Sequence, residues 1–180
     1  MLVLQTARQT LHCLAEEQLF LLIESPEALA CLLGLAVADD LLGAATELAL
    51  RGKLPRLRRA SAANLPWRSY WLVVERASAT IIGLAGFRCE PDAEGEVELS
   101  YAIAPAWRGA GHASEAGAAL IGWAFSQPGC RAICAHGVRQ DNAASRAVLA
   151  RLGLRPIGSN GASADYGLSR AVYAATHGGP

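Results

Sequence analysis

The sequence has no net charge, because 16 Lys and Arg residues balance 16 Asp and Glu residues. A general nucleic-acid binder relies on a net positive field, so this balance argues against nucleic acid as a partner. Charged residues of either sign make up only 18% of the chain, whereas 52% of the residues are hydrophobic. Such a chain can bury enough apolar surface to fold, which excludes wholesale disorder and favours a single domain over residues 1–180.

Long apolar segments are also missing. The longest apolar stretch, Ala28–Ala38, is much shorter than the roughly 20 residues that a membrane-spanning helix needs. Glu16 and Glu17 interrupt the first apolar run, and no basic segment precedes it, so the pattern of a signal peptide is absent. We therefore expect a cytoplasmic protein that does not associate with membranes.

Disulfide bonds are not expected either. An odd number of cysteines in a chain without a secretory pattern indicates reduced thiols, most of them buried as small apolar residues. The five cysteines are Cys13, Cys31, Cys89, Cys130 and Cys134.

The first third of the chain has the apolar spacing of helices. A helix over 40–51 is expected to be capped near Asp39 and ended by Gly52, and the basic run Arg51–Arg59 is expected to be a solvated loop. Residues 1–70 are thus predicted to be mainly helical. The predicted elements are helices over 16–23, 26–33 and 40–51, and a short strand over 10–14.

From Trp71 the pattern changes to strands, beginning with a hairpin. A unit of strand, helix, strand and helix follows, which indicates an α+β or mixed α/β fold. The predicted strands are 71–75, 80–87, 96–104, 132–138, 154–157 and 166–173, and the predicted helices are 113–125 and 142–152.

A glycine-containing loop stands between the strand over 96–104 and the helix over 113–125. Small residues let backbone amides approach an anion, and the N-terminus of the following helix faces the same point. Arg108 adds a planar cation suited to phosphate oxygens. An ordinary strand-to-helix turn would use the same glycines. The loop reads Arg108, Gly109, Ala110, Gly111, His112 and Ala113.

Two other phosphate motifs do not fit this loop. A dinucleotide fold needs a third glycine and an acidic residue about 20 residues further on, and both are missing. A P-loop needs Gly-Lys-Ser/Thr, which the sequence does not contain.

The segment Arg108-x-x-Gly111-x-Ala113, between a strand and a helix, resembles the coenzyme A pyrophosphate loop of the Gcn5-related N-acetyltransferases (GNAT). Residues 141–154, from Asp141-Asn142 to Leu152-Gly153-Leu154, resemble the second coenzyme-side helix of that family. Residues 98–103 and 114–116 are similar to the RimJ/RimL-like branch, which acetylates N-termini of ribosomal proteins. The resemblance covers about 71–158 well and the rest weakly.

This resemblance implies a mixed, mostly antiparallel sheet flanked by helices, with two central parallel strands, 96–104 and 132–138, that splay apart. Acetyl-CoA would enter the gap as cosubstrate, its pyrophosphate on the amides of residues 109–113. Backbone groups near Ile103 and the side chain of Asn142 would contact its pantetheine arm. Residues 71–160 would then form the acetyl-CoA-binding part, and residues 1–70 the acceptor side.

The resemblance also suggests catalytic residues. Glu98 is the expected general base, with Glu96 second because period-2 spacing puts it on the same strand face; both could instead be solvated strand carboxylates. Many relatives protonate the leaving thiolate with a tyrosine, but Leu149 stands at that position. Ser145 could donate a hydrogen bond to the sulfur, or bond back to its own helix turn. A backbone N–H near Ile103 would stabilise the oxyanion.

Cys134 and His136 stand at strand spacing with Cys130 nearby, which raises the question of a metal. A single Cys-x-His lacks the four-ligand spacing of a structural zinc site, so no metal is expected, and His136 is expected to point at the acceptor cleft. Trp67, Tyr70 and Trp71 are expected to pack where the helical part meets the sheet.

The expected function is acetyl-CoA-dependent transfer of an acetyl group to a primary amine, either a protein N-terminus or a small molecule. A catalytically degenerate acyl-CoA-binding or sensor protein of the same fold is the alternative, and a structural partner module is a third. Nothing in residues 1–70 identifies the amine, and a homodimer is left open.

Overall fold

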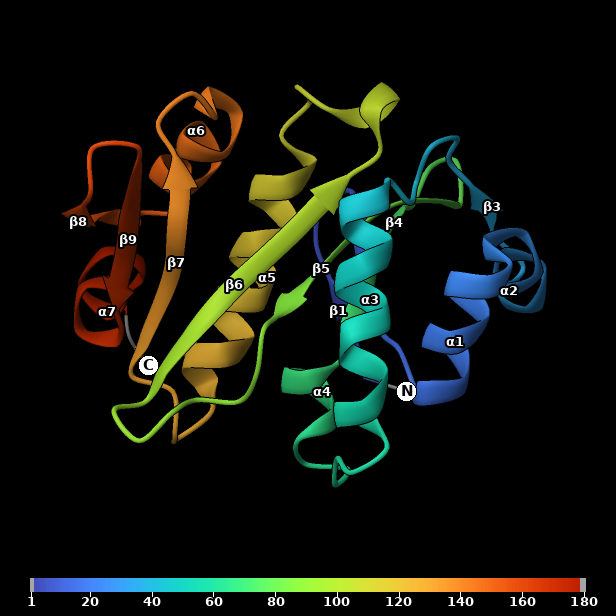
Figure 1. Ribbon diagram of the computed structural model, residues 1–180, viewed down its shortest axis with the longest axis horizontal. Helices are drawn as coiled ribbons and strands as arrows, with labels where there is room; N and C mark the ends of the chain where they lie inside the picture. Colours follow the sequence, from blue (N-terminus) through green and yellow to red (C-terminus); the bar gives the residue numbers. More distant parts are fainter. Residues whose placement is uncertain (1, 179–180) are drawn as a thin grey trace.

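The computed structural model describes residues 2–178 and is drawn in Figure 1. The strands are β1 (Val3–Gln5), β2 (Gln9–Cys13), β3 (Ala36–Val37), β4 (Tyr70–Glu75), β5 (Thr80–Phe87), β6 (Glu96–Ile103), β7 (Ala132–Arg139), β8 (Arg155–Ser159) and β9 (Ser163–Ser169). The helices are α1 (Glu16–Glu24), α2 (Pro26–Leu33), α3 (Ala44–Leu57), α4 (Leu65–Arg68), α5 (His112–Ser126), α6 (Ala143–Arg151) and α7 (Arg170–His177), with a short 3-10 helix, η1 (Pro105–Trp107).

One mixed sheet carries these elements, in the order β1-β2-β4-β5-β6-β7-β9-β8, and β3 pairs with β5 outside that path. Neighbouring strands are antiparallel except for β6 with β7 and β3 with β5, which are parallel. The expected mixed, mostly antiparallel sheet flanked by helices is therefore confirmed. Strands β1 and β2, from the part expected to be mainly helical, extend the same sheet.

Each face of the sheet covers its own apolar core, because alternate residues of a strand point to opposite faces. In β4, Trp71 and Val73 belong to the core beneath α5 and α6. Tyr70, Leu72 and Val74 belong to the core beneath α1, α2 and α3. Figure 1 shows α3 and α5 on opposite sides of the sheet.

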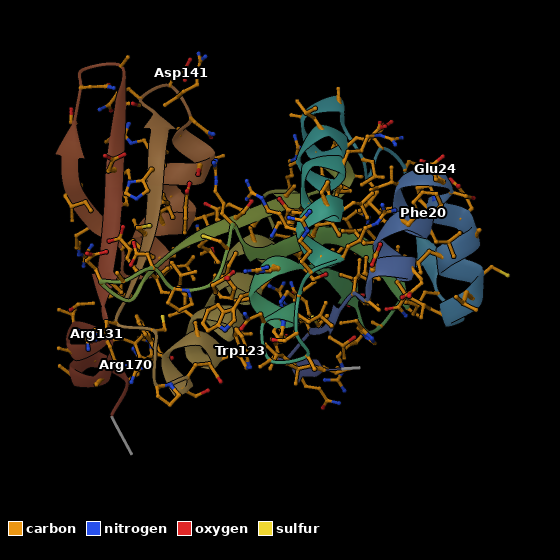
Figure 2. The ribbon with its side chains drawn as sticks, turned by 60° about the horizontal axis from the view of Figure 1, so that its bottom comes forward. Phe20, Glu24, Trp123, Arg131, Asp141 and Arg170 are labelled. Carbon is orange, nitrogen blue, oxygen red and sulfur yellow. The ribbon has the colours of Figure 1, made fainter. Side chains whose placement is uncertain are left out.

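An aromatic cluster fixes α4 against the core beneath α5. The ring of Trp67 lies 4.5 Å from that of Trp123 and 5.0 Å from that of Phe87, and Trp71 lies 5.6 Å from Trp123 (Figure 2 labels Trp123). Trp67 and Trp71 thus pack where the N-terminal part meets the sheet, as expected. Tyr70 points to the other face and packs in the core beneath α1, α2 and α3, so it too lies where the helical part meets the sheet, as expected.

Helix α3 differs from the sequence expectation at both ends. It begins after Gly43 rather than at Asp40, because Asp40 has a left-handed φ of 52° that ends regular structure there. It continues through Gly52 to Leu57, so most of the basic run Arg51–Arg59 is helical and not a loop. The buried face of Leu50, Lys53 and Leu57 explains the extension, since packing of a helical stripe outweighs the low helix propensity of one glycine.

The last predicted strand, over 166–173, was placed too far along the chain, because β9 begins at Ser163. Strand β9 ends at Ser169, and residues 170–177 form α7 instead of continuing the strand to Tyr173. The side chain of Ser169 accepts a hydrogen bond from the backbone N–H of Val172 at 3.3 Å, which caps the helix. Tyr173 then packs on Phe125 of α5 with ring centroids 5.0 Å apart.

Lys53 is the only lysine of the sequence, and it is buried within α3. Its Nζ donates to the carbonyl oxygens of Arg68 at 2.9 Å and of Ser69 at 3.4 Å, and also to that of Phe87. It lies 4.6 Å from the centre of the Tyr70 ring. Burial lowers the pKa of Lys53 to about 8. This one side chain ties α3 to the ends of β4 and β5.

The five cysteines carry free thiols, as expected. Cys13, Cys130 and Cys134 are buried, whereas Cys31 and Cys89 are exposed. Between residues 2 and 178, no helix combines the length and the apolar character that crossing a bilayer requires.

Strand β5 approaches β6 so closely at Gly83 that no side chain fits there. A Cβ at Gly83 would lie 2.5 Å from Cδ1 of Ile103 and 2.6 Å from the carbonyl oxygen of Ala102. We expect Gly83→Ala to lower the free energy of unfolding by about 2–3 kcal/mol, since overpacking displaces backbone. Urea denaturation measures it. Gly52→Ala is the control, because open space surrounds Gly52 in α3 and alanine there should raise stability by up to about 1 kcal/mol.

Candidate functional site

The two central parallel strands separate along their length. Strands β6 and β7 pair only at Glu96–Ala132, Val97–Ile133 and Glu98–Cys134. Beyond Glu98, β6 stays with β5, and beyond Cys134, β7 stays with β9, and Figure 1 shows the two strands diverging. The expected splay is confirmed. An open cleft of about 170 Å³ lies there, lined by Arg88, Glu98, Leu99, Ser100, Tyr101, Ala135, His136, Val138 and Ser145.

The glycine loop has the backbone that anion binding needs. Gly109 and Gly111 have φ angles of +80° and +82°, which favour glycine, and a Cβ on Gly109 would meet no atom within 4 Å. Helix α5 begins after Gly111 without a side-chain cap. Within residues 2–178, the backbone N–H groups of residues 112–114, in the first turn of α5, donate no hydrogen bond. Free N–H groups at a helix N-terminus, together with the helix dipole, suit an anion, so binding at this loop stays a prediction.

Two arginines lie at this loop, and only one was expected from the sequence. Arg108 donates through Nε to the carbonyl oxygen of Ile103 at 2.8 Å, which fixes its guanidinium beside the end of β6. Arg8, in the turn between β1 and β2, donates through Nη1 to the carbonyl oxygen of Ala110 at 3.0 Å. Its Nη2 lies 3.6 Å from where a Cβ of Gly111 would be. The loop therefore carries two cations.

Glu115 holds Arg8 in place. Its Oε2 lies 2.7 Å from Nε of Arg8, and its Oε1 accepts from the backbone N–H of Arg8 at 2.8 Å and from Thr6 Oγ1 at 2.6 Å. Glu115 lies in the first turn of α5, where its negative charge also favours the helix dipole. No local signal links these residues, since Arg8 and Glu115 are 107 positions apart.

The ring of His112 is buried and is held by contacts with Gln9. Its Nδ1 lies 2.9 Å from Gln9 Nε2, which also donates to the carbonyl oxygen of His112 at 3.1 Å. Burial lowers the pKa of this imidazole, and the nearby Arg8 lowers it further. The backbone of His112, rather than its ring, is thus what the loop offers to a ligand.

Two carboxylates of β6 face the cleft side of the sheet. The Glu98 side chain is 19% exposed, and its Oε1 lies 3.1 Å from Nε of Arg88, the residue that follows β5. Oε1 of Glu96 lies 3.3 Å from Nε2 of His136 on β7. Glu98 is the last residue of β6 that pairs with β7, so it lies where the gap opens.

Ser145, the predicted hydrogen-bond donor to the sulfur, has a partner that the sequence did not reveal. Its Oγ lies 3.0 Å from the phenolic oxygen of Tyr101, and burial raises the pKa of Tyr101. Asn142 caps α6, because its Oδ1 accepts from the backbone N–H of Ser145 at 3.0 Å. Leu149 is fully buried in the core. The hydroxyl pair Tyr101 and Ser145 therefore lies at the cleft, and the contacts predicted for Asn142 and Ile103 with a ligand stay predictions.

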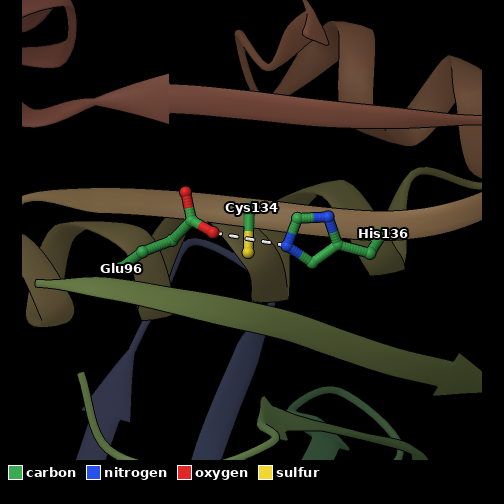
Figure 3. A group of neighbouring side chains, drawn as sticks. All are labelled: Glu96, Cys134 and His136. Carbon is green, nitrogen blue, oxygen red and sulfur yellow. Dashed lines mark hydrogen bonds and ion pairs between the residues drawn. The ribbon is translucent and has the colours of Figure 1, made fainter. Parts of the chain in front are cut away.

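Cys134 lies between Glu96 and His136, as Figure 3 shows. One ligand atom from each of these three residues lies within 4.8 Å of the others, whereas Cys130 is not part of the group. Burial raises the pKa of the Cys134 thiol, and hydrogen bonding to Glu96 and then the charge of that carboxylate raise it further. His136 lines the cleft beside Glu98, and its place in an acceptor site stays a prediction.

Comparison with known proteins gives two sequence matches. The family model described as acetyltransferase (GNAT) domain matches residues 42–155. Over 83 residues the chain is 34% identical to the uncharacterized N-acetyltransferase YjdG of Bacillus subtilis (strain 168). That match covers 46% of this chain and 49% of the relative, so it spans about half of the relative's length.

Solved structures share the fold over nearly the whole chain. The RimL ribosomal L7/L12 alpha-N-protein acetyltransferase in complex with coenzyme A is 17% identical, with a TM-score of 0.65 and coverage of 95% of this chain and 99% of that one. The ribosomal-protein-S5-alanine acetyltransferase of Vibrio fischeri is 18% identical, with a TM-score of 0.63 and coverage of 94% and 97%. A GNAT-family acetyltransferase of Bacillus anthracis is 17% identical, with a TM-score of 0.62 and coverage of 94% of this chain and 99% of that one.

Proposed function

The chain belongs to the acetyltransferase (GNAT) family, and on that premise we propose that it is an acetyl-CoA-dependent N-acetyltransferase. It moves the acetyl group to a primary amine, a protein N-terminus or a small molecule, which attacks the thioester directly. One observation carries the proposal: strands β6 and β7 splay apart, and the glycine loop at the start of α5 has two arginines beside it. The similarity to RimJ/RimL-like proteins in sequence motifs and in fold supports that branch.

The loop of residues 108–113 fits the pyrophosphate of coenzyme A. Its first-turn amides have no acceptor among residues 2–178, its glycines leave open space, and Arg8 and Arg108 supply positive charge. Arginine is the side chain best suited to phosphate oxygens, since its donors form a planar fork. We therefore propose residues 108–113, joined by Arg8, as the cofactor-binding loop.

Arg8→Gln is expected to weaken acetyl-CoA binding about tenfold. Losing one hydrogen bond to a charged group costs about 1.5 kcal/mol or more, which corresponds to that factor. Isothermal titration calorimetry with acetyl-CoA measures the change. Arg76→Gln is the matched control, because exposed Arg76 bonds the carbonyl oxygen of Thr6 in the same turn but makes no contact with the loop. Equal affinities for the two variants would contradict the role of Arg8.

When bound, acetyl-CoA supplies the acetyl group as a thioester. Glu98 accepts the proton of the amine, directly or through water, at the point where the strands part. Ser145 donates a hydrogen bond to the leaving sulfur, and Tyr101, whose phenolic oxygen lies 3.0 Å from Ser145 Oγ, orients that hydroxyl. The acceptor face carries the carboxylates of Glu96 and Glu98, which favour a cationic amine.

The test combines binding and turnover. Saturating acetyl-CoA, at about 100 times its Kd, should stabilise the fold by about 2.7 kcal/mol and raise Tm by roughly 5–10 °C. Mass spectrometry should then detect acetylation of at least one member of a panel of short peptides and small primary amines. Absence of both effects would contradict the proposal.

A second function, acyl-CoA binding without transfer, is favoured by one observation. The position where many relatives place a tyrosine is the fully buried Leu149, which can donate no proton. Thermal stabilisation by acetyl-CoA with no acetylated product across the panel would support this binding or sensor role, whereas multiple turnovers on any single acceptor would exclude it.

A further inference from the structure

Two strands bring three metal-ligating side chains together at the closed end of the splay. Glu96 lies on β6, and Cys134 and His136 lie on β7, all on one face of the sheet because the parallel register sets Glu96 beside Ala132 and Glu98 beside Cys134. A carboxylate oxygen, the thiol sulfur and an imidazole nitrogen lie within 4.8 Å of one another. Figure 3 shows Cys134 between the other two.

Each ring nitrogen of His136 lies near a different carboxylate. Its Nε2 faces Glu96 at 3.3 Å, while its Nδ1 lies 3.5 Å from Oδ1 of Asp165 on β9. The same Oδ1 accepts from the backbone N–H of Gly137 at 2.8 Å, so Asp165 is itself held. Histidines that bind metals commonly donate their other ring N–H to a carboxylate, which fixes the ring and the tautomer.

We propose that Glu96, Cys134 and His136 bind a divalent cation of the zinc class, with Asp165 orienting His136. One sulfur, one nitrogen and one oxygen donor suit Zn²⁺ and its analogues Co²⁺ and Cd²⁺, whereas Mg²⁺ and Ca²⁺ prefer oxygen alone. The side chains of Glu96 and His136 are 34% and 45% exposed, so the cation has a path from solvent. Three protein ligands leave a fourth position for water.

The sequence alone disfavours this site, because Cys134-x-His136 supplies only two ligands. Glu96 is 38 positions before Cys134, and Asp165 is 29 positions after His136. Both join the site only through strand pairing, β6 with β7 and β7 with β9. Cation binding does not depend on acetyl transfer, so the proposal stands or falls independently of the proposed enzymatic function.

The test is a titration with Co²⁺ in protein stripped by a chelator. Cys31 and Cys89 are exposed thiols that could bind cobalt, so the starting protein carries Cys31→Ser and Cys89→Ser. We expect two signals: a thiolate-to-cobalt charge-transfer band in the near ultraviolet, and the absorption bands of tetrahedral Co²⁺ in the visible. Added Zn²⁺ should abolish both. Absence of the charge-transfer band in this protein overturns the proposal.

Variants then assign the ligands. Cys134→Ser should abolish the charge-transfer band, whereas Cys130→Ser, the same change at a buried thiol outside the group, should retain it. Asp165→Asn should keep the band but weaken Co²⁺ binding about 10- to 100-fold. His136→Ala removes a half-exposed ring without disturbing the core, and it should weaken binding more than Asp165→Asn. A band that survives Cys134→Ser, or unchanged affinity in His136→Ala, overturns the assignment.

Discussion

Replacing Glu98 by glutamine is expected to lower kcat for acetyl transfer about 100-fold while leaving KM for acetyl-CoA nearly unchanged. General bases contribute roughly 100- to 10,000-fold, and the lower value applies here because an amine can also lose its proton to water. Glutamine keeps the shape of Glu98 but accepts no proton. The rise of the rate with pH should therefore become shallower. Thiol release with the best acceptor of the panel measures both constants.

Two matched variants make this result specific. Glu94→Gln removes an exposed carboxylate from the loop just before β6 and should leave kcat unchanged. Glu96→Gln tests the second candidate on the same strand face, two residues away. A larger loss of kcat in Glu96→Gln than in Glu98→Gln would transfer the base role to Glu96, and an unchanged kcat in Glu98→Gln would contradict a carboxylate base at that position.

Raising the pH from 9 to 10 is expected to lower the free energy of unfolding by about 2 kcal/mol, with a steeper loss above pH 10. Burial raises the pKa of Cys13 to about 12 and that of Cys130 to about 11, and it also raises the pKa of Cys134. Unfolded thiols ionise near pH 9, so they release protons that the folded chain keeps. Stability from these thiols is complete below pH 9 and is lost above it.

Lys53 opposes this loss. Its pKa is about 8 in the folded chain and 10.5 ordinarily, so between these values the unfolded chain binds a proton that the folded chain does not, and stability rises with pH. Urea denaturation at pH 8, 9 and 10 separates the two effects. Lys53→Met should deepen the loss between pH 9 and 10 by about 1 kcal/mol, and Cys13→Ala should reduce it by about 1 kcal/mol. Identical pH profiles for both variants would contradict this explanation.

Local chemistry made part of the fold and of the site predictable. The loop of residues 108–113 was recognisable because positive φ angles require glycine and a helix N-terminus has its own residue preferences, and both signals lie in adjacent residues. The hairpin of β4 and β5 followed from two β-rich apolar runs with a turn between them. Helix α3 was misplaced because its bounds depend on a buried stripe, Leu50, Lys53 and Leu57, and not on the local signals at Asp39 and Gly52.

The side-chain partners of the site were beyond the sequence. Tyr101 lies within residues 98–103, and its hydroxyl meets that of Ser145, 44 positions further along the chain. Arg8 and Glu115 meet only because β2 lies near the start of α5. No spacing rule connects such pairs, since they depend on which strands are neighbours and in which register.

The sequence by itself determined the family, the glycine loop before α5 and the strand that carries Glu98, because each depends on contiguous residues whose backbone preferences are local. Tertiary structure alone decided what surrounds them: the second cation at the loop, the Tyr101–Ser145 pair and the group of Glu96, Cys134 and His136 backed by Asp165. The physical reason is that strand order and register place side chains from distant segments on one face. Strand order and register are set only when the whole sheet is assembled.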